Sequence, residues 1–181
     1  LKGQDLRNLP QKDLRQEISY VPQKAWLFSG TIGENLAHGK ENAGKEEMVH
    51  ALEIAQADFV KNLPQGLETR AAQGGTNFSG GQKQRLCIAR ALMKDSDLYI
   101  FDDSFSALDF KTDKALRDAL KEETKEAAVL IIAQRISTIL HASQIVVLDE
   151  GEIAGIGTHE YLMENCDVYR DIARSQMKGG E

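Results

Sequence analysis

The sequence predicts an α/β fold built on a mostly parallel sheet, and three observations lead to this prediction. Two short runs are continuously apolar, LYIF at 98–101 and AVLIIA at 128–133. Such runs are typical of strands buried on both faces of a parallel sheet. Segments with the apolar spacing of helices alternate with these runs. Strands that alternate with helices favour a sheet covered by helices on both faces.

The first part of the chain contains one strand candidate and two helix candidates. ISYV at 18–21 favours a strand and ends at Pro22-Gln23. Residues 33–38 are a short helix candidate, and the polar stretch GKENAGK at 39–45 predicts a loop. Apolar or small residues recur at spacings of 3, 4 and 7 over 46–56, which indicates a helix with one buried side.

The second part continues this alternation. A glycine-containing linker leads into a helix at about Gly80 to Met93. An amphipathic helix follows at Asp109 to Glu126, with Leu116, Ala119 and Leu120 facing inward. The remaining expected elements are a hairpin with strands at 144–148 and 152–157, and two closing helices at 159–165 and 168–177.

Charge and cysteine content limit the functions that the chain can have. Its 22 Lys and Arg residues are scattered among 28 Asp and Glu residues, for a formal net charge of -6. No basic stripe therefore indicates nucleic-acid binding. Cys87 and Cys166 lie far apart, which favours reduced thiols over a disulfide framework. No apolar run approaches the about 20 residues of a membrane span, so we expect any membrane contact to go through a partner.

The segment FSGGQKQR at 78–85 predicts an anion site at the start of a helix. Gly80 and Gly81 let backbone amides approach a phosphate closely, and Ser79 adds a hydroxyl. The helix that follows directs its positive end to the same place. The segment is therefore a candidate for binding the phosphates of a nucleotide.

Paired carboxylates end the apolar run that comes next. LYIFDD at 98–103 closes with Asp102 and Asp103, and SALD follows at 106–109. In this order, the SGGQ segment, the apolar run with its carboxylates and SALD resemble three motifs of ATP-binding cassette (ABC) proteins. These motifs are the signature, the Walker B strand and the D-loop. The resemblance covers nearly the entire chain.

The resemblance implies a P-loop NTPase (RecA-like) fold with an inserted helical subdomain. We expect that subdomain at about 33–93 and parts of the RecA-like core at 1–32 and 94–181. The P-loop pattern GxxxxGK[ST] is matched in spacing only at 39–45, where Glu46 follows instead of a hydroxyl residue. We therefore expect the N-terminal P-loop part, with its Walker A motif, to be absent, which would leave unpaired strand edges.

The resemblance also assigns roles to single residues, for a site that takes ATP and Mg²⁺. Gln23 resembles the Q-loop glutamine, which touches the magnesium ion and the attacking water. Asp102 would hold Mg²⁺, usually through water, because this cation prefers oxygen ligands. Asp103 stands where the general base is expected, and Gln134 replaces a histidine that contacts the γ-phosphate. The residues expected to bind the nucleotide are Phe78, Ser79, Gly80, Gly81 and Gln82, with Asp109 of the D-loop.

Two departures from the family pattern indicate a degenerate hydrolytic site. The family's base is normally Glu, and the shorter Asp103 side chain places its carboxylate about 1.5 Å further back. A general base must lie within roughly 2.6 to 3.2 Å of the proton it takes. Gln134 can donate a hydrogen bond but carries no charge. The SGGQ segment is intact, so the chain resembles the subunit of heterodimeric ABC exporters that serves the ATP of a second nucleotide-binding domain.

The segment KAWLFSGTIGENLAHG at 24–39 resembles the exporter version of the region after the Q-loop. In exporters its apolar patch receives the coupling helices of a transmembrane domain. We therefore expect Trp26, Leu27 and Phe28 to be partly exposed, although the same residues could simply belong to the core. Residues 69–75 stand in the place of the X-loop, which faces the same partner. Such a protein would lie at the cytoplasmic face of the cell membrane as part of a transporter.

Two further functions stay open. A soluble ABC ATPase of the DNA-repair or translation type would show a long coiled-coil insertion, a second cassette or a basic face, and the sequence contains none of them. A non-catalytic interaction module would fit a chain that naturally has no P-loop. An upstream reading frame with a P-loop and six apolar spans would favour the exporter.

Overall fold

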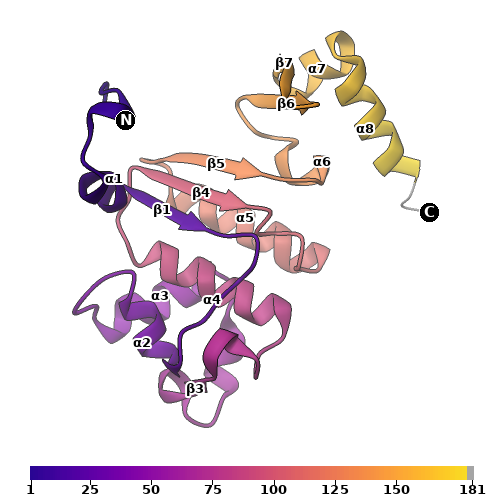
Figure 1. Cartoon of the computed structure of the whole chain (residues 1–181). Helices are drawn as coiled ribbons and strands as arrows, with labels where there is room; N and C mark the ends of the chain where they lie inside the picture. Colours follow the sequence, from indigo (N-terminus) through magenta and orange to yellow (C-terminus); the bar gives the residue numbers. More distant parts are fainter. Residues whose placement is uncertain (179–181) are drawn as a thin grey trace. The chain divides into compact units, whose positions relative to one another are not determined.

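The computed structural model describes residues 1–178 of the chain (Figure 1). The chain divides into two compact units, Leu1–Ile132 and Ala133–Glu181. The first unit contains a parallel sheet with helices, and the second contains a hairpin with helices. The division into a helical subdomain at 33–93 and a core on either side of it stays a prediction.

The sheet of the first unit is parallel, as the sequence predicts. Its strands are β1 (Ile18–Val21), β4 (Leu98–Asp102) and β5 (Ala128–Ile132), in the order β1-β4-β5. Both pairings are parallel, and Ile18, Leu98 and Ala128 lie side by side in register. Parallel neighbours need a crossover connection, and helix α5 (Phe110–Glu123) supplies it between β4 and β5 (Figure 1).

The main core lies on one side of this sheet. Phe101 of β4 is fully buried, and its ring stacks on Tyr99 at 6.5 Å between centroids. Helix α4 (Gly80–Leu92) buries one side in this core, and α5 contributes Leu116, which is 0% exposed. The predicted helices at 80–93 and 109–126 are confirmed, although α4 ends one residue and α5 three residues earlier than expected.

The burial expected for the AVLIIA strand is wrong. Its residues do form β5, but Val129, Leu130 and Ile132 are 42%, 50% and 45% exposed. The reason is the position of β5, which forms an edge of the sheet and, in the part of the chain that the structure describes, pairs only with β4. Apolar content predicts that a segment forms a strand, whereas burial depends on the neighbours that cover it. The expected cover on both faces of the sheet is therefore incomplete within residues 1–132.

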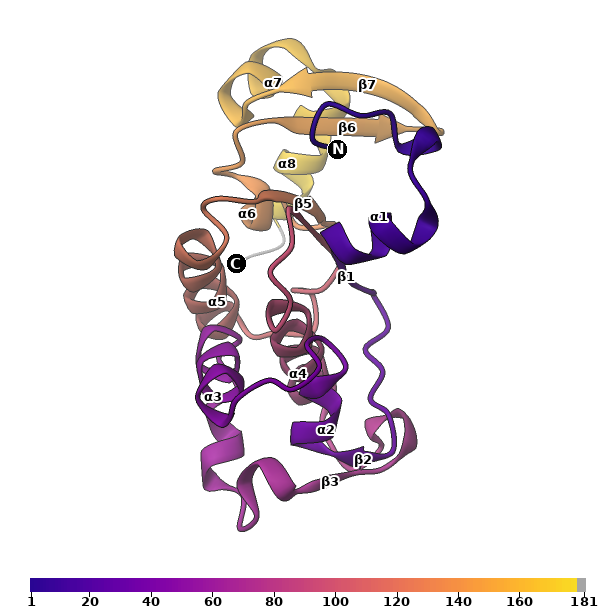
Figure 2. The same ribbon diagram turned by 90° about the vertical axis from the view of Figure 1, so that its left-hand side faces the viewer.

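The segment between β1 and β4 forms the helical layer of the first unit. It contains α2 (Ile32–Ala37) and α3 (Lys45–Ile54), and α3 packs against both α4 and α5 (Figure 2). The pair of short strands β2 (Gly30–Thr31) and β3 (Arg70–Ala71) is antiparallel. Four 3-10 turns complete the unit, at Leu6–Asn8, Asp58–Asn62, Gly66–Glu68 and Gln73–Gly75, together with α1 (Gln11–Glu17), and the sequence reasoning missed all of these.

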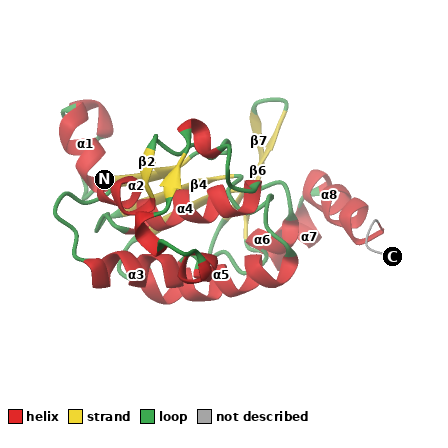
Figure 3. Cartoon of the chain, turned by 90° about the horizontal axis from the view of Figure 1, so that it is seen from below, coloured by secondary structure: helices red, strands yellow, loops and turns green. Residues whose placement is uncertain are grey.

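The second unit contains the predicted hairpin. Strands β6 (Ile145–Asp149) and β7 (Glu152–Gly157) are antiparallel, with a bulge between Val147 and Leu148. Glu150 and Gly151 both have positive φ, at 47° and 85°, which suits the two-residue turn of a hairpin. The helices are α6 (Ile136–Ile139), α7 (His159–Asn165) and α8 (Asp167–Lys178) (Figure 3). Cys166 of this unit and Cys87 of the first are both buried and unlinked.

Candidate functional site

Ser79 begins the signature helix with a reciprocal cap. The Ser79 Oγ accepts a hydrogen bond from the backbone N–H of Gln82 at 3.3 Å, and the Gln82 Oε1 accepts one from the Ser79 N–H at 3.0 Å. The Ser79 hydroxyl proton can still donate, because Oγ acts as an acceptor in this cap. The amides of Gly80 and Gly81 are among the first N–H groups of α4, which have no partner within a helix. The start of α4 therefore offers a set of donors to an anion.

The two glycines of the signature have different surroundings. A Cβ atom on Gly80 would meet nothing within 4 Å, whereas one on Gly81 would lie 3.2 Å from the backbone oxygen of Ala107. Gly81 thus lets α4 approach the loop after β4 closely. Gly80 is exposed and faces open space, where a ligand can reach its backbone.

Phe78 anchors the signature segment. Its half-buried ring packs at a tilt against Phe59, with 6.3 Å between centroids. The Arg85 guanidinium lies over the Phe59 ring, 5.0 Å from its centre, and donates to the backbone oxygen of Gln56 at 2.7 Å. Phe78 is therefore placed to hold the segment in position.

Asp102 and Asp103 lie at the carboxyl end of the central strand, and each is held by a donor. The Tyr20 hydroxyl donates to Asp102 Oδ2 at 2.8 Å, and Gln23 Nε2 donates to Asp103 Oδ2 at 3.2 Å. Asp103 has a φ of 43°, in the left-handed region, and its N–H donates to the Ile132 oxygen at 2.9 Å. Positive φ is uncommon for a residue with a side chain and costs free energy, so the backbone at Asp103 holds local strain within the candidate site.

The loop after these carboxylates leads into α5. Ser106 Oγ donates to the backbone oxygen of Asp103 at 2.9 Å, which tightens the turn. Asp109 caps α5, because its carboxylate accepts from both the backbone N–H and the hydroxyl of Thr112, at 3.0 and 2.7 Å. These hydrogen bonds, the backbone one first, hold the pKa of the Asp109 carboxyl below its usual value. Asp109 is therefore an ionised cap at neutral pH.

Gln134 belongs to the second unit, whereas the other candidate residues belong to the first. Its backbone oxygen accepts a hydrogen bond from Gln176 Nε2 at 2.7 Å, and Gln176 Oε1 accepts from the Ile136 N–H at 2.9 Å. Gln176 of α8 thus fixes the backbone before α6. The Gln134 residue itself is exposed.

The oxygen ligands that the first unit offers fit a magnesium ion. Asp102, Asp103 and Gln23 offer carboxylate and amide oxygens, which this hard cation prefers. Within residues 1–178 no group of three or more His, Cys, Asp and Glu side chains forms a complete metal site. The two findings agree, because Mg²⁺ is usually held by one or two carboxylates together with waters and substrate phosphates.

Trp26 and Phe28 form an exposed aromatic patch, at 45% and 47% exposure, as expected. The expectation for Leu27 is wrong: it is 1% exposed, because alternate residues of this extended segment point to opposite sides and Leu27 enters the core. The Arg90 guanidinium lies 5.3 Å from the centre of the Phe28 ring and donates to the Trp26 oxygen at 3.0 Å. The backbone of Gly74 lies against Trp26, since a Cβ on Gly74 would be 3.1 Å from the indole ring. The segment 69–75 and the patch are thus neighbours.

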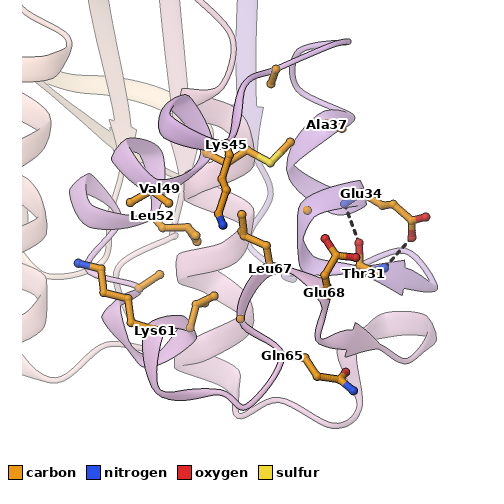
Figure 4. Close-up of a pocket in the computed structure, with 16 residues that line it drawn as sticks. Thr31, Glu34, Ala37, Lys45, Val49, Leu52, Lys61, Gln65, Leu67 and Glu68 are labelled. Atoms are coloured by element: carbon orange, nitrogen blue, oxygen red, sulfur yellow. Dashed lines mark hydrogen bonds between the residues drawn. The ribbon is translucent and has the colours of Figure 1, made fainter.

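A separate cavity of about 640 Å³ lies in the helical layer (Figure 4). Its apolar wall includes Val49, Leu52 and Leu67, and Lys45 and Glu68 lie among its polar lining residues. None of the signature, Walker B or D-loop residues lines it. This cavity is therefore distinct from the candidate nucleotide site.

Sequence reasoning missed Tyr20 as a site residue. The alternation in ISYV places Tyr20 on the opposite face from the buried Ser19 and Val21. The sequence contained one signal for such a role, a tyrosine on the outward face of the strand three residues before Gln23. Its contact with Asp102 depends on the pairing of β1 with β4, which the sequence does not state.

The parallel sheet with Asp102 at the end of its central strand, and the glycine-rich start of α4, define a nucleotide-binding domain of the P-loop NTPase class. Residues 1–106 match the family model described as ABC transporter, and the chain belongs to this family. No helix within residues 1–178 is long and apolar enough to cross a membrane.

Known proteins that resemble the chain are transporters. An ABC transporter ATP-binding protein of Mycobacterium tuberculosis is 45% identical over 178 residues, which are 96% of this chain and 30% of that protein. An ATP-dependent lipid A-core flippase of Legionella pneumophila is 39% identical over 180 residues, 99% of this chain and 31% of the flippase. A bacterial Atm1-family ABC exporter solved with ATP bound superposes with a TM-score of 0.94 at 37% identity, over 97% of this chain and 31% of the exporter. The chain thus spans less than a third of the length of these relatives.

Proposed function

We propose that the chain is the ATP-binding part of an exporter-type ABC transporter and supplies its signature segment to an ATP site shared with a second nucleotide-binding domain. The observation that carries this proposal is the start of α4, where Ser79 caps the helix while Gly80 leaves the backbone open to a ligand. The names of the relatives and the exposed patch of Trp26 and Phe28 favour the exporter over a soluble DNA-repair or translation ATPase.

Each candidate residue has a defined task in this mechanism. The Ser79 hydroxyl and the amides of Gly80 and Gly81 bind the γ-phosphate of the ATP held by the partner domain. Asp102 and Gln23 would hold Mg²⁺ through oxygen atoms. When bound with ATP, magnesium neutralises charge on the phosphate oxygens. Asp109 lies in the D-loop and couples the two ATP sites.

The site that this chain builds for its own nucleotide is degenerate. The short Asp103 side chain is already hydrogen-bonded to Gln23, and it is a poor general base for water. Gln134 replaces a residue that can carry a charge. Hydrolysis then depends on the partner domain, as expected for a heterodimer in which one site hydrolyses ATP and the other mostly keeps it bound.

The membrane partner docks on the patch of Trp26 and Phe28. Both rings are exposed; the Arg90 guanidinium lies over the Phe28 ring, and the backbone of Gly74 lies close to the Trp26 indole. Exposed aromatic side chains of this kind are favoured at interfaces. We infer that the coupling helices of a transmembrane domain cover the patch at the cytoplasmic face of the membrane.

The test of the signature role compares two cap variants in the full-length transporter. Ser79→Ala and Thr158→Ala each remove a side-chain cap with a 3.3 Å hydrogen bond, and each costs about 1 kcal/mol of stability. Only Ser79→Ala should reduce nucleotide trapping at the partner's P-loop. Equal trapping by both variants contradicts the proposal.

A second pair of substitutions tests the degenerate site. Asp103→Glu combined with Gln134→His restores the usual base and histidine of the family. In the full-length heterodimer this double variant should raise ATP hydrolysis at the site of this subunit, measured by site-resolved turnover. Unchanged turnover at that site counts against the degenerate-site proposal.

A further inference from the structure

Tyr20 places a phenol beside the carboxylate that is proposed to hold magnesium. Tyr20 pairs with Ile100 in the register of β1 and β4, so it lies on the same face of the sheet as Asp102, two residues further along β4. Its hydroxyl donates to Asp102 Oδ2 at 2.8 Å, and the side chain is 54% exposed.

We propose that Tyr20 is a positioning residue that holds the Asp102 carboxylate in one orientation, with Oδ2 occupied by the phenol and Oδ1 directed to the metal. The inference rests on the proposed function, since it takes Asp102 as the magnesium carboxylate. Tyr20 does not touch the nucleotide in this assignment and acts through Asp102 alone.

The direction of the hydrogen bond supports this assignment. An ionised carboxylate only accepts hydrogen bonds, so the phenol is the donor. Gln23 makes the equivalent contact with Asp103 Oδ2, so that β1 and the residues after it supply one donor to each of two adjacent carboxylates. Each donor restricts the directions in which the oxygens of its carboxylate point.

The phenol is well suited to fix an orientation. Tyr20 extends from a strand hydrogen-bonded to β4, and a tyrosine ring has only two rotatable bonds, so little conformational entropy is lost in holding it. Groups that hydrogen-bond to a metal ligand typically change metal affinity by about 10- to 100-fold when they are removed. Because Tyr20 is half exposed and water competes for the bond, we expect a value near the low end of this range.

The experiment measures metal affinity in the full-length transporter. The protein is loaded with a slowly hydrolysed ATP analogue and freed of excess nucleotide. The partner domain's own metal carboxylate is neutralised, so that only the site of this chain reports. Bound Mn²⁺ is then followed by electron paramagnetic resonance. Tyr20→Phe should raise the half-saturating Mn²⁺ concentration about tenfold without changing the melting temperature measured without metal.

The control is Tyr161→Phe, which removes a hydroxyl from a side chain of similar exposure, 55%, and should leave Mn²⁺ binding unchanged. Asp102→Asn separates the inference from the proposed function. If Asp102→Asn weakens Mn²⁺ binding and Tyr20→Phe does not, Tyr20 has no positioning role. If Asp102→Asn itself has no effect, the proposed magnesium site is wrong. If Tyr20→Phe weakens binding equally in the Asp102→Asn background, Tyr20 does not act through Asp102.

Discussion

At the scale of single residues, neighbouring positions of one motif do different physical work. In the signature segment, Phe78 packs against Phe59, while Ser79 and Gln82 cap each other. Gly81 makes room for the Ala107 carbonyl, whereas a Cβ on Gly80 would meet nothing within 4 Å. Packing within the chain therefore does not require a glycine at position 80. Of these residues, Gly80 points most directly to a ligand.

This contrast predicts that fold and function separate at the two glycines. Gly80→Ala should leave the free energy of unfolding unchanged or slightly higher, because its Cβ meets nothing and alanine favours a helix over glycine. Its methyl group would instead obstruct a phosphate, so nucleotide trapping by the full-length transporter should fall. Gly81→Ala should lower stability, because its Cβ would lie 3.2 Å from the Ala107 oxygen. Urea unfolding and nucleotide trapping measure the two effects.

Gly33→Ala is the matched control, since Gly33 lies in the first turn of α2 and a Cβ there makes only ordinary contacts, the nearest at 3.6 Å. It should change neither stability by much nor trapping. A Gly80→Ala protein that unfolds as easily as Gly81→Ala would contradict the assignment of Gly80 to a ligand.

Asp109 predicts an acid-sensitive contribution to stability. Its hydrogen bonds to Thr112 lower the pKa of the folded carboxyl below the unfolded value of about 3.9. Stability from this group is therefore fully present above the unfolded pKa and is lost as pH falls through the folded pKa. Asp109→Asn keeps a good cap without a titrating group, so its unfolding midpoint should fall less steeply than that of the wild type below about pH 4.

Asp118→Asn, on the exposed side of the same helix, is the control for the change in net charge. If Asp109→Asn and Asp118→Asn show the same pH dependence, the cap does not contribute as proposed.

At the scale of elements, the sequence predicts well those that carry their own pattern. β1, β4, α4 and the β6–β7 hairpin follow from apolar runs, a helix cap or turn residues. By contrast, α1 was missed because QKDLRQE at Gln11–Glu17 has a single apolar residue and gives no stripe. The burial of β5 was misjudged because it depends on neighbouring strands. The Tyr20 contact was missed because it joins residues 82 positions apart in sequence.

Helix α5 ties the sheet to the helical layer, and Leu116 is its most deeply buried residue in the core. Leu116→Ala should lower the free energy of unfolding by about 2–5 kcal/mol, because it removes apolar contacts and leaves a cavity. Urea unfolding measures the change. Leu6→Ala makes the same chemical change at a side chain that is 49% exposed, and it should cost no more than about 0.5 kcal/mol. Similar losses in both variants would mean that α5 is not part of the cooperative core.

At the scale of the whole molecule, the exposed edge of β5 predicts association between copies. Among residues 1–178, β5 pairs with β4 alone, so it presents a backbone edge with Val129, Leu130 and Ile132 exposed, and such edges pair with other chains. The 181-residue chain alone should therefore self-associate, as size-exclusion chromatography with light scattering would show.

Leu130→Lys places a charge on this strand and should shift the population toward monomer. Leu6→Lys makes the same change at a side chain that is 49% exposed in the 3-10 turn Leu6–Asn8, outside any strand, and serves as the control. A stable, well-folded monomer of the unchanged chain contradicts the prediction.

The phosphate-binding groups of the chain predict that it does not bind ATP tightly by itself. The 181 residues contain no complete GxxxxGK[ST] sequence, because the match at 39–45 is followed by Glu46. That stretch is split in the structure between a loop and the start of α3, and Gly44 caps this helix with the Glu47 side chain, so its groups serve the fold. A P-loop supplies both a lysine and a cradle of backbone amides to the phosphates of its own nucleotide. In the proposed mechanism, the signature segment supplies the complementary donors to a nucleotide that another domain already holds. Calorimetry on this chain with magnesium-ATP should therefore detect no micromolar binding.

Adding a nucleotide-loaded partner domain should produce an association that Ser79→Ala weakens and Thr158→Ala does not. Micromolar binding by the chain alone would contradict this division of labour.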